Sequence, residues 1–92
     1  MASNELNKQM MWLIKIVSNR DFSNKDRDFI AELVSEEARK MRGDYSFIIH
    51  DIVESKRYSN ILIEGTKSAL ANLLSVIKDN ILYKITYRRF ML

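Results

Sequence analysis

The sequence predicts a single α+β domain whose elements follow in the order βαββαβ. Two observations support this fold class: two helical periods that begin at capping residues, and four short stretches rich in β-branched residues. Nearly half the residues are apolar and proline is absent, so we expect the chain to fold and not to stay disordered. Ninety-two residues suffice for one sheet covered by helices but not for a second core. We therefore expect residues 10–92 to form one domain, preceded by a flexible, polar lead-in at residues 1–9.

Residues 10–17 are the first predicted element, and two assignments fit them. The stretch MWLIKIV is rich in β-branched residues and alternates two sets of side chains, which favours a strand. The longer stretch 4–17 also fits an amphipathic helix. In that case the rest of the chain would be a three-stranded ββαβ unit preceded by two helices.

Capping residues and periodicity indicate two helices. Ser23 can accept a hydrogen bond from an exposed backbone N–H group, and apolar residues then recur at helical spacing. The first helix is predicted over residues 24–42, where Gly43 follows basic residues and is placed to end it. Thr66 caps a second helix that runs to about Lys78.

The remaining strands follow from apolar runs and the turns between them. Residues 45–55 have a nearly continuous apolar centre, which is typical of a central strand. The polar turn 55–57 makes the next strand, residues 58–64, its hairpin partner. The last strand is predicted over residues 81–90. Right-handed crossovers would place both helices on one face of an antiparallel sheet, with the first and third strands at its centre, which is the ferredoxin-like arrangement.

Strand alternation predicts which side chains face the helices and which lie on the open side of the sheet. On the third strand Ile61 and Ile63 point towards the helices, and on the last strand Tyr83 and Tyr87 do the same and enter the core. The open side then carries Leu13, Lys15, Val17, Tyr58, Asn60, Leu62 and Glu64. Uncovered apolar side chains of this kind are typical of a contact surface.

No group of residues predicts catalysis, a metal or a cofactor. His50 is the only histidine, and its sequence neighbours Asp51 and Glu54 lie on different faces of the strand, so we expect a structural role for it. Gly43 and Gly65, the only glycines, build no phosphate-binding loop. Cysteine is absent, which excludes disulfides and thiolate metal sites and fits an intracellular protein, cytoplasmic or nuclear. We expect a protein that is not an enzyme.

The charge balance permits contact with nucleic acid without requiring it. Fifteen basic residues against twelve acidic ones give a formal charge of +3. Candidates for phosphate contacts lie in the hairpin turn and the last strand: Lys56, Arg57, Lys84, Arg88 and Arg89. Their alternative role is a solvated edge that limits aggregation. RNA-recognition motifs carry stacking aromatics where Asn60 and Leu62 stand here, and the longest apolar run, residues 10–14, is too short to span a membrane.

Two short motifs resemble a known family. The stretch WLIKI, followed by a long charged helix, and the stretch ILIEG before the second helix resemble the NGN domain, the N-terminal domain of NusG-type transcription elongation factors. The archaeal and eukaryotic large-subunit members have a Trp-containing first strand and a later strand of the form Tyr-Ile-Tyr-Ile-Glu-Ala. Residues 77–83 resemble the passage that leads to the last strand, so that the resemblance covers about residues 10–89.

The resemblance implies a non-enzymatic role in transcription elongation, exerted by binding RNA polymerase and a small zinc-ribbon partner subunit. In that family the carboxylate at the end of the strand meets a helix N-terminus of the partner, where hydrogen bonding and the helix dipole favour negative charge. This role would carry onto Glu64, with Leu62, Asn60 and Leu13 beside it in the partner-binding set.

Two other functions are compatible with the sequence. One is a small viral or mobile-element regulator that binds nucleic acid or a host protein, and the other is a structural homodimer formed through the open sheet or an edge. The sequence leaves the oligomeric state undetermined.

Overall fold

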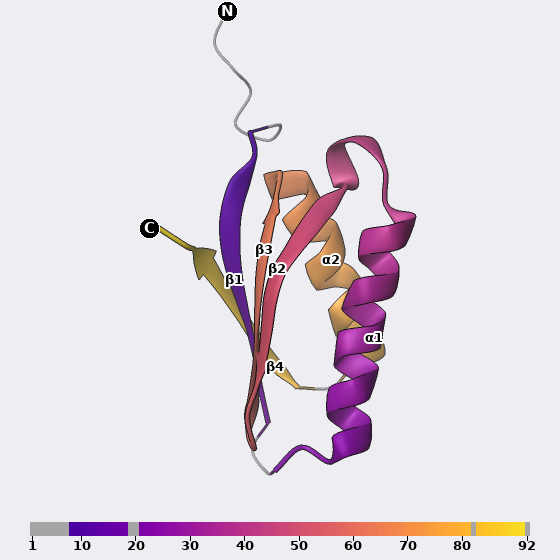
Figure 1. Ribbon diagram of the computed structural model, residues 1–92, viewed down its shortest axis with the longest axis vertical. Helices are drawn as coiled ribbons and strands as arrows, with labels where there is room; N and C mark the ends of the chain where they lie inside the picture. Colours follow the sequence, from indigo (N-terminus) through magenta and orange to yellow (C-terminus); the bar gives the residue numbers. More distant parts are fainter. Residues whose placement is uncertain (1–7, 19–20, 82, 92) are drawn as a thin grey trace, which may run out of the picture.

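The computed structural model describes residues 8–18, 21–81 and 83–91, and it has the predicted element order (Figure 1). Its elements are β1 (Met10–Val17), α1 (Asn24–Lys40), the 3-10 turn η2 (Gly43–Tyr45), β2 (Phe47–Glu54), β3 (Tyr58–Gly65), α2 (Lys67–Asn80) and β4 (Lys84–Arg89). Residues 10–17 are therefore a strand, and the helical alternative is wrong. Most of the predicted lead-in, residues 1–7, lies outside the described residues.

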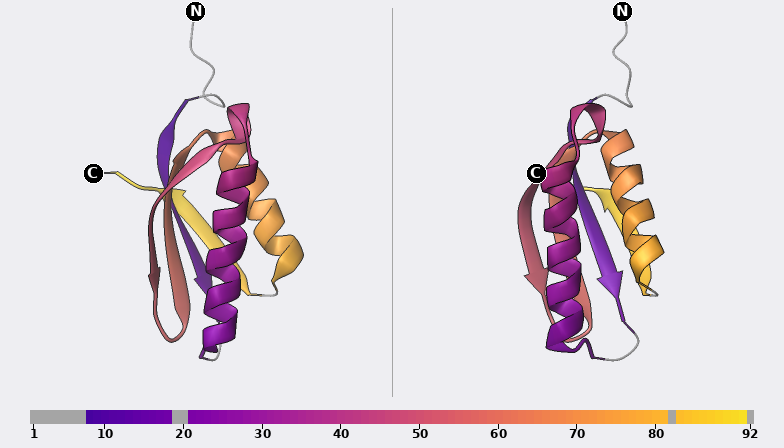
Figure 2. Two further views of the ribbon diagram at one scale, coloured as in Figure 1. Left: turned by 45° about the vertical axis from the view of Figure 1, so that its right-hand side comes forward. Right: turned by 90° about the vertical axis from the view of Figure 1, so that its right-hand side faces the viewer.

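The four strands form one antiparallel sheet in the order β2-β3-β1-β4, with β1 and β3 at its centre as predicted. Both helices cover the same face of this sheet (Figures 1 and 2). The prediction of a central position for β2 is wrong, because β2 pairs with β3 alone and is an edge strand. Its continuous apolar run has another origin. Phe47 lies in the core with Ile49 and Ile52 packed against it, whereas Ile48 and Val53 are 60% and 48% exposed on the other face.

A β-bulge in β2 sets which of its residues face the helices. From the hairpin turn, Asp51 pairs with Leu62, but Ile49 rather than His50 pairs with Ile63. The extra residue shifts the alternation, because two residues of the bulged strand oppose one on its partner. As a result Ile49 packs against the core, and His50 lies on the open side of the sheet.

Both predicted helix caps are confirmed. The Ser23 side chain accepts a hydrogen bond from the Asp26 N–H group, and the Thr66 side chain accepts one from the Ala69 N–H group. Helix α1 ends at Lys40, two residues before the predicted end, and Gly43 lies in η2 with a φ of +63°. Helix α2 continues to Asn80, so β4 begins at Lys84 rather than at residue 81.

The core lies between the sheet and the two helices. It combines the helix-facing side chains of the central strands with one face of each helix: Trp12, Ile14, Ile16, Phe22, Ile30, Val34, Phe47, Ile61, Ile63, Ala69, Leu70, Leu73, Leu74 and Ile77. The Trp12 indole N–H group donates to the Gly65 carbonyl oxygen at 3.2 Å. This hydrogen bond ties the first strand to the end of β3 inside the apolar layer.

The two tyrosines predicted for the core behave differently. Tyr83 is partly buried, packs edge-on against Phe22 and donates from its hydroxyl to Asp26 Oδ2 at 3.1 Å. Tyr87 is 55% exposed, so its placement in the core is wrong, although its ring contacts Trp12. The reason is that β4 diverges from the helices towards its C-terminal end (Figure 1).

Within the part of the chain that the structure describes, no helix has the length and apolar character needed to cross a membrane.

Candidate functional site

The face of the sheet opposite the helices is the candidate site, and we call it the open face. Cross-strand partners share a face, so the register defines its members. They are Met11, Leu13, Lys15 and Val17 of β1, Ile48, His50, Asp51 and Val53 of β2, Tyr58, Asn60, Leu62 and Glu64 of β3, and Lys84, Thr86 and Arg88 of β4. All seven residues that alternation predicted for the open side belong to it.

The four predicted partner-binding residues lie next to one another on the open face. Asn60, Leu62 and Glu64 follow at alternate positions of β3, and Leu13 is directly opposite Leu62 on β1. The side chains of Leu13 and Leu62 are partly exposed, and Ile48 beside Glu64 is more exposed still. The open face thus has an apolar centre bordered by a carboxylate.

Sequence reasoning missed the partner of Glu64. The His50 Nε2 atom lies 2.9 Å from Glu64 Oε1, and the two side chains are 40% and 39% exposed. The two residues are 14 positions apart, and the β2 bulge brings His50 to this face. A half-exposed pair of this kind contributes at most about 1 kcal/mol to stability, so its main effect is to orient the carboxylate.

A hollow of about 560 Å³ adjoins this pair at the end of the open face. Its lining comes from the start of β1, the ends of β3 and β4, and β2: Lys8, Gln9, Met10, Met11, His50, Glu64, Arg89, Phe90 and Met91. Among residues 8–18, 21–81 and 83–91, no three histidine, cysteine or acidic side chains gather where they could hold a metal ion. The hollow combines methionine and phenylalanine side chains with the Glu64 carboxylate, His50 and the basic residues Lys8 and Arg89, which suits binding by surface complementarity.

The structure divides the predicted basic residues among three places. Lys84 and Arg88 belong to the open face, because they pair with Val17 and Leu13. Lys56 and Arg57 lie in the β2–β3 turn, where Arg57 Nε is 3.4 Å from Asp21 Oδ1. The fifth residue, Arg89, pairs with Trp12 and so points towards the helix side, although it also lines the hollow.

Lys15 is a further basic residue of the open face, and it was not among the residues predicted from the sequence to contact phosphate. Its Nζ atom lies 4.9 Å from the centre of the Tyr58 ring, a cation–π contact that holds the ammonium group over the open face. Lys15 pairs with Thr86, between Lys84 and Arg88 along β4. The β1–β4 half of the open face is therefore positively charged, whereas the β2 edge carries Asp51.

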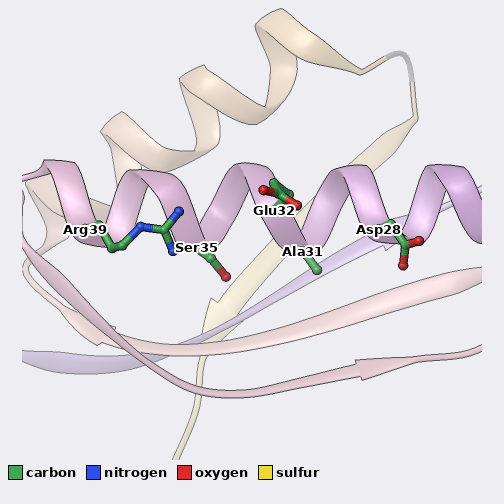
Figure 3. Close-up of a pocket in the computed structure, with 5 residues that line it drawn as sticks. All are labelled: Asp28, Ala31, Glu32, Ser35 and Arg39. Carbon is green, nitrogen blue, oxygen red and sulfur yellow. The ribbon is translucent and has the colours of Figure 1, made fainter.

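A second hollow, of about 420 Å³, follows the exposed side of α1 (Figure 3). It is lined by Asp28, Ala31, Glu32, Ser35 and Arg39, all from this one helix. Their side chains are spread along the helix axis instead of converging on one point (Figure 3). This groove therefore lacks the convergent polar groups that a ligand site requires.

Comparison of the chain with protein-family models, with curated proteins and with solved structures finds no match. The NGN resemblance accordingly stays a prediction from two short motifs. One position in them has a structural explanation: a Cβ atom at Gly65 would lie 3.0 Å from Phe47 Cβ, so the alanine of the family pattern would crowd β2 here.

Proposed function

We propose that the chain is a non-enzymatic interaction module that binds a protein partner through the Glu64 end of its open face. In keeping with the NGN resemblance, the proposed partner is a small zinc-ribbon subunit, and the proposed role is to support transcription elongation on RNA polymerase. The observation that carries the proposal is the position of Glu64, whose half-exposed carboxylate stands at the border of the apolar patch formed by Leu13, Leu62 and Ile48.

The chemistry of this arrangement suits a helix N-terminus. Free backbone N–H groups and the positive end of the helix dipole both favour a carboxylate. His50 contacts Oε1 of Glu64, and a carboxylate has further lone pairs that can accept hydrogen bonds from such N–H groups. The neighbouring leucines would supply apolar contact around this polar anchor, which is the usual anatomy of a binding patch.

The test is calorimetric titration of the zinc-ribbon subunit with the wild-type chain and with Glu64→Gln. A hydrogen bond to a charged group contributes about 1.5–3 kcal/mol, so E64Q should weaken the complex by about tenfold or more. Glu32→Gln on the exposed side of α1 is the matched control and should bind like the wild type. Equal affinities of E64Q and the wild type would remove Glu64 from the site, and no binding by the wild-type chain would refute the partner.

A second function, nucleic-acid binding, is favoured by the gathering of cations on one half of the open face. Lys15, Lys84 and Arg88 lie on neighbouring strands, and Lys56 and Arg57 lie at the same end of the sheet as Lys84. About four phosphate contacts to a single strand would lower the affinity roughly 50-fold between 50 and 200 mM salt.

Fluorescence anisotropy with a labelled single-stranded RNA, measured across this salt range, tests the second function. Neutralising Lys15, Lys56, Arg57, Lys84 and Arg88 together should abolish the salt-dependent binding. The control neutralises Lys67 and Lys78, two exposed residues of α2, and should leave the binding unchanged. A wild-type chain that does not bind, or a salt-independent affinity, would reject this function.

A further inference from the structure

The open face is organised as rows of cross-strand partners that run from the β4 edge to the β2 edge. The most informative row crosses all four strands in the order Arg88, Leu13, Leu62, Asp51. It begins with a cation, continues with two apolar side chains and ends with an anion. Arg88 and Asp51 are exposed, and within the described residues neither forms an ion pair.

This row is complementary to the same row read in the opposite direction. Consider a twofold axis that runs parallel to the strands, between the open faces of two copies. It places the β4 edge of one copy over the β2 edge of the second copy, and each row faces the same row of the other copy. Arg88 of one copy then lies over Asp51 of the second copy, and Leu13 lies over Leu62. Because the operation is symmetric, each of these contacts occurs twice.

The rows on either side are compatible with the same operation. On one side, Met11, Glu64 and Ile48 form a row that continues to Phe90, the residue after β4, whose N–H group donates to the Met11 carbonyl oxygen. Its reversal places Phe90 of one copy over Ile48, the most exposed aliphatic side chain of the open face, on the second copy. The row on the other side, Thr86, Lys15, Asn60, Val53, places the Lys15 ammonium group over the Asn60 amide.

We propose that a second copy of the chain covers the open face, forming a twofold dimer in which two sheets pack face to face with their helices outward. Packed sheets keep their strand directions within about 30° of each other, a geometry that a twofold axis along the strands permits. The charge complementarity of the Arg88 row selects this orientation. A twofold axis perpendicular to the strands, in the plane midway between the two sheets, would instead place each strand over the same strand of the second copy. Arg88 would then lie near β4 of the second copy.

The size of the face sets the expected strength of the dimer. Strands β1, β2 and β3 have 8 residues each. At a rise of about 3.3 Å and a spacing of about 4.8 Å, four strands cover about 500 Å² per copy, or about 1,000 Å² in total. This area lies at the lower limit of specific interfaces, so we expect a dissociation constant in the micromolar range.

The dimer does not depend on the proposed partner, but the two would use the same face. A partner that binds at Glu64 would compete with the second copy, so that self-association would keep the apolar patch covered until the partner is present. Sedimentation of the chain alone tests the dimer, whereas calorimetry with the zinc-ribbon subunit tests the partner. Failure of one therefore leaves the other intact.

Sedimentation equilibrium of the wild-type chain and two charge-reversed variants is the test. Arg88→Asp places two carboxylates at each repeated contact, and Asp51→Arg places two guanidinium groups there. Each variant alone should dimerise at least tenfold more weakly than the wild type, because like charges in an interface oppose association. An equimolar mixture of R88D and D51R should form a heterodimer of near wild-type affinity, since both contacts again join opposite charges.

Arg39→Asp, an equal charge change on the exposed side of α1, is the control and should leave the dimer unchanged. Three outcomes would overturn the proposal: a wild-type chain that is monomeric up to about 1 mM, variants that dimerise as well as the wild type, or a mixture that associates no better than its components. Because both substitutions are on exposed side chains, circular dichroism should show the native fold in each variant.

Discussion

At the scale of single residues, Gly65 lies on β3 where this strand is closely packed against β2 and α2. A Cβ atom there would meet Phe47 Cβ at 3.0 Å and Ala69 Cβ at 3.3 Å. Overpacking of this kind costs about 1–3 kcal/mol, so we expect Gly65→Ala to lower the free energy of unfolding by that amount. Urea titration followed by Trp12 fluorescence measures it.

Gly43 provides the contrasting case. Its φ is +63° and nothing lies within 4 Å of an added Cβ atom, so the backbone and not the packing restricts it. Asparagine adopts this conformation with little strain, and Gly43→Asn should stay within about 0.5 kcal/mol of the wild type. If G65A lowered the free energy of unfolding by no more than G43N does, this result would contradict the explanation of Gly65 by close packing.

The His50–Glu64 pair orients a carboxylate more than it stabilises the fold. We expect His50→Ala to change the free energy of unfolding by less than about 1 kcal/mol, because both side chains are half-exposed. Thermal unfolding measures this value. A loss of several kcal/mol would mean that the pair is a structural element of the sheet.

At the scale of elements, the two helix caps share one geometry but differ in burial. Ser23 is exposed, whereas Thr66 is buried and also donates from its hydroxyl to the Asp44 carbonyl oxygen. Loss of a cap costs about 0.5–2 kcal/mol. Thr66→Ala should reach or exceed the upper end, since it also leaves the Asp44 carbonyl without this donor, and Ser23→Ala should stay near the lower end. Chemical denaturation of the two variants checks the order, and equal losses would contradict it.

Local signals in the sequence were sufficient for most elements. Capping residues marked both helix starts, the short polar turn marked the hairpin, and alternation placed Leu13, Leu62 and Glu64 on one face. The assignment of β2 to the centre of the sheet was wrong. An apolar run shows that a strand carries apolar side chains on both faces, but it does not show whether both edges of the strand are hydrogen-bonded to neighbouring strands. Ile48 and Val53 are exposed in the structure.

The His50–Glu64 contact at the site could not be predicted because it depends on the bulge. Counted regularly from the hairpin turn, His50 would oppose Ile63 and face the helices. The bulge moves Ile49 into that position and turns His50 towards Glu64. No residue type in this stretch marks a bulge, and in the structure the bulge accompanies the packing of both Phe47 and Ile49 on the core side.

At the scale of the whole molecule, the sheet order predicts a gradient of protection against hydrogen exchange. Strands β1 and β3 pair on both sides and carry most of the strand contribution to the core, whereas β2 and β4 are edges. The amides of β1 and β3 should exchange only through global unfolding, while those of β4 should exchange faster by local opening. Hydrogen exchange followed by NMR measures this gradient, and protection of β4 equal to that of β1 would be inconsistent with the sheet order.

The central claim is that the open face, and not the helix side, is the binding surface. The most direct measurement is a titration of the isotope-labelled chain with the zinc-ribbon subunit, followed residue by residue by NMR. We expect chemical-shift changes at Leu13, Leu62 and Glu64, with no changes at exposed α1 residues such as Glu32 and Arg39. Changes confined to the helices, or no changes at saturating partner, would contradict the account.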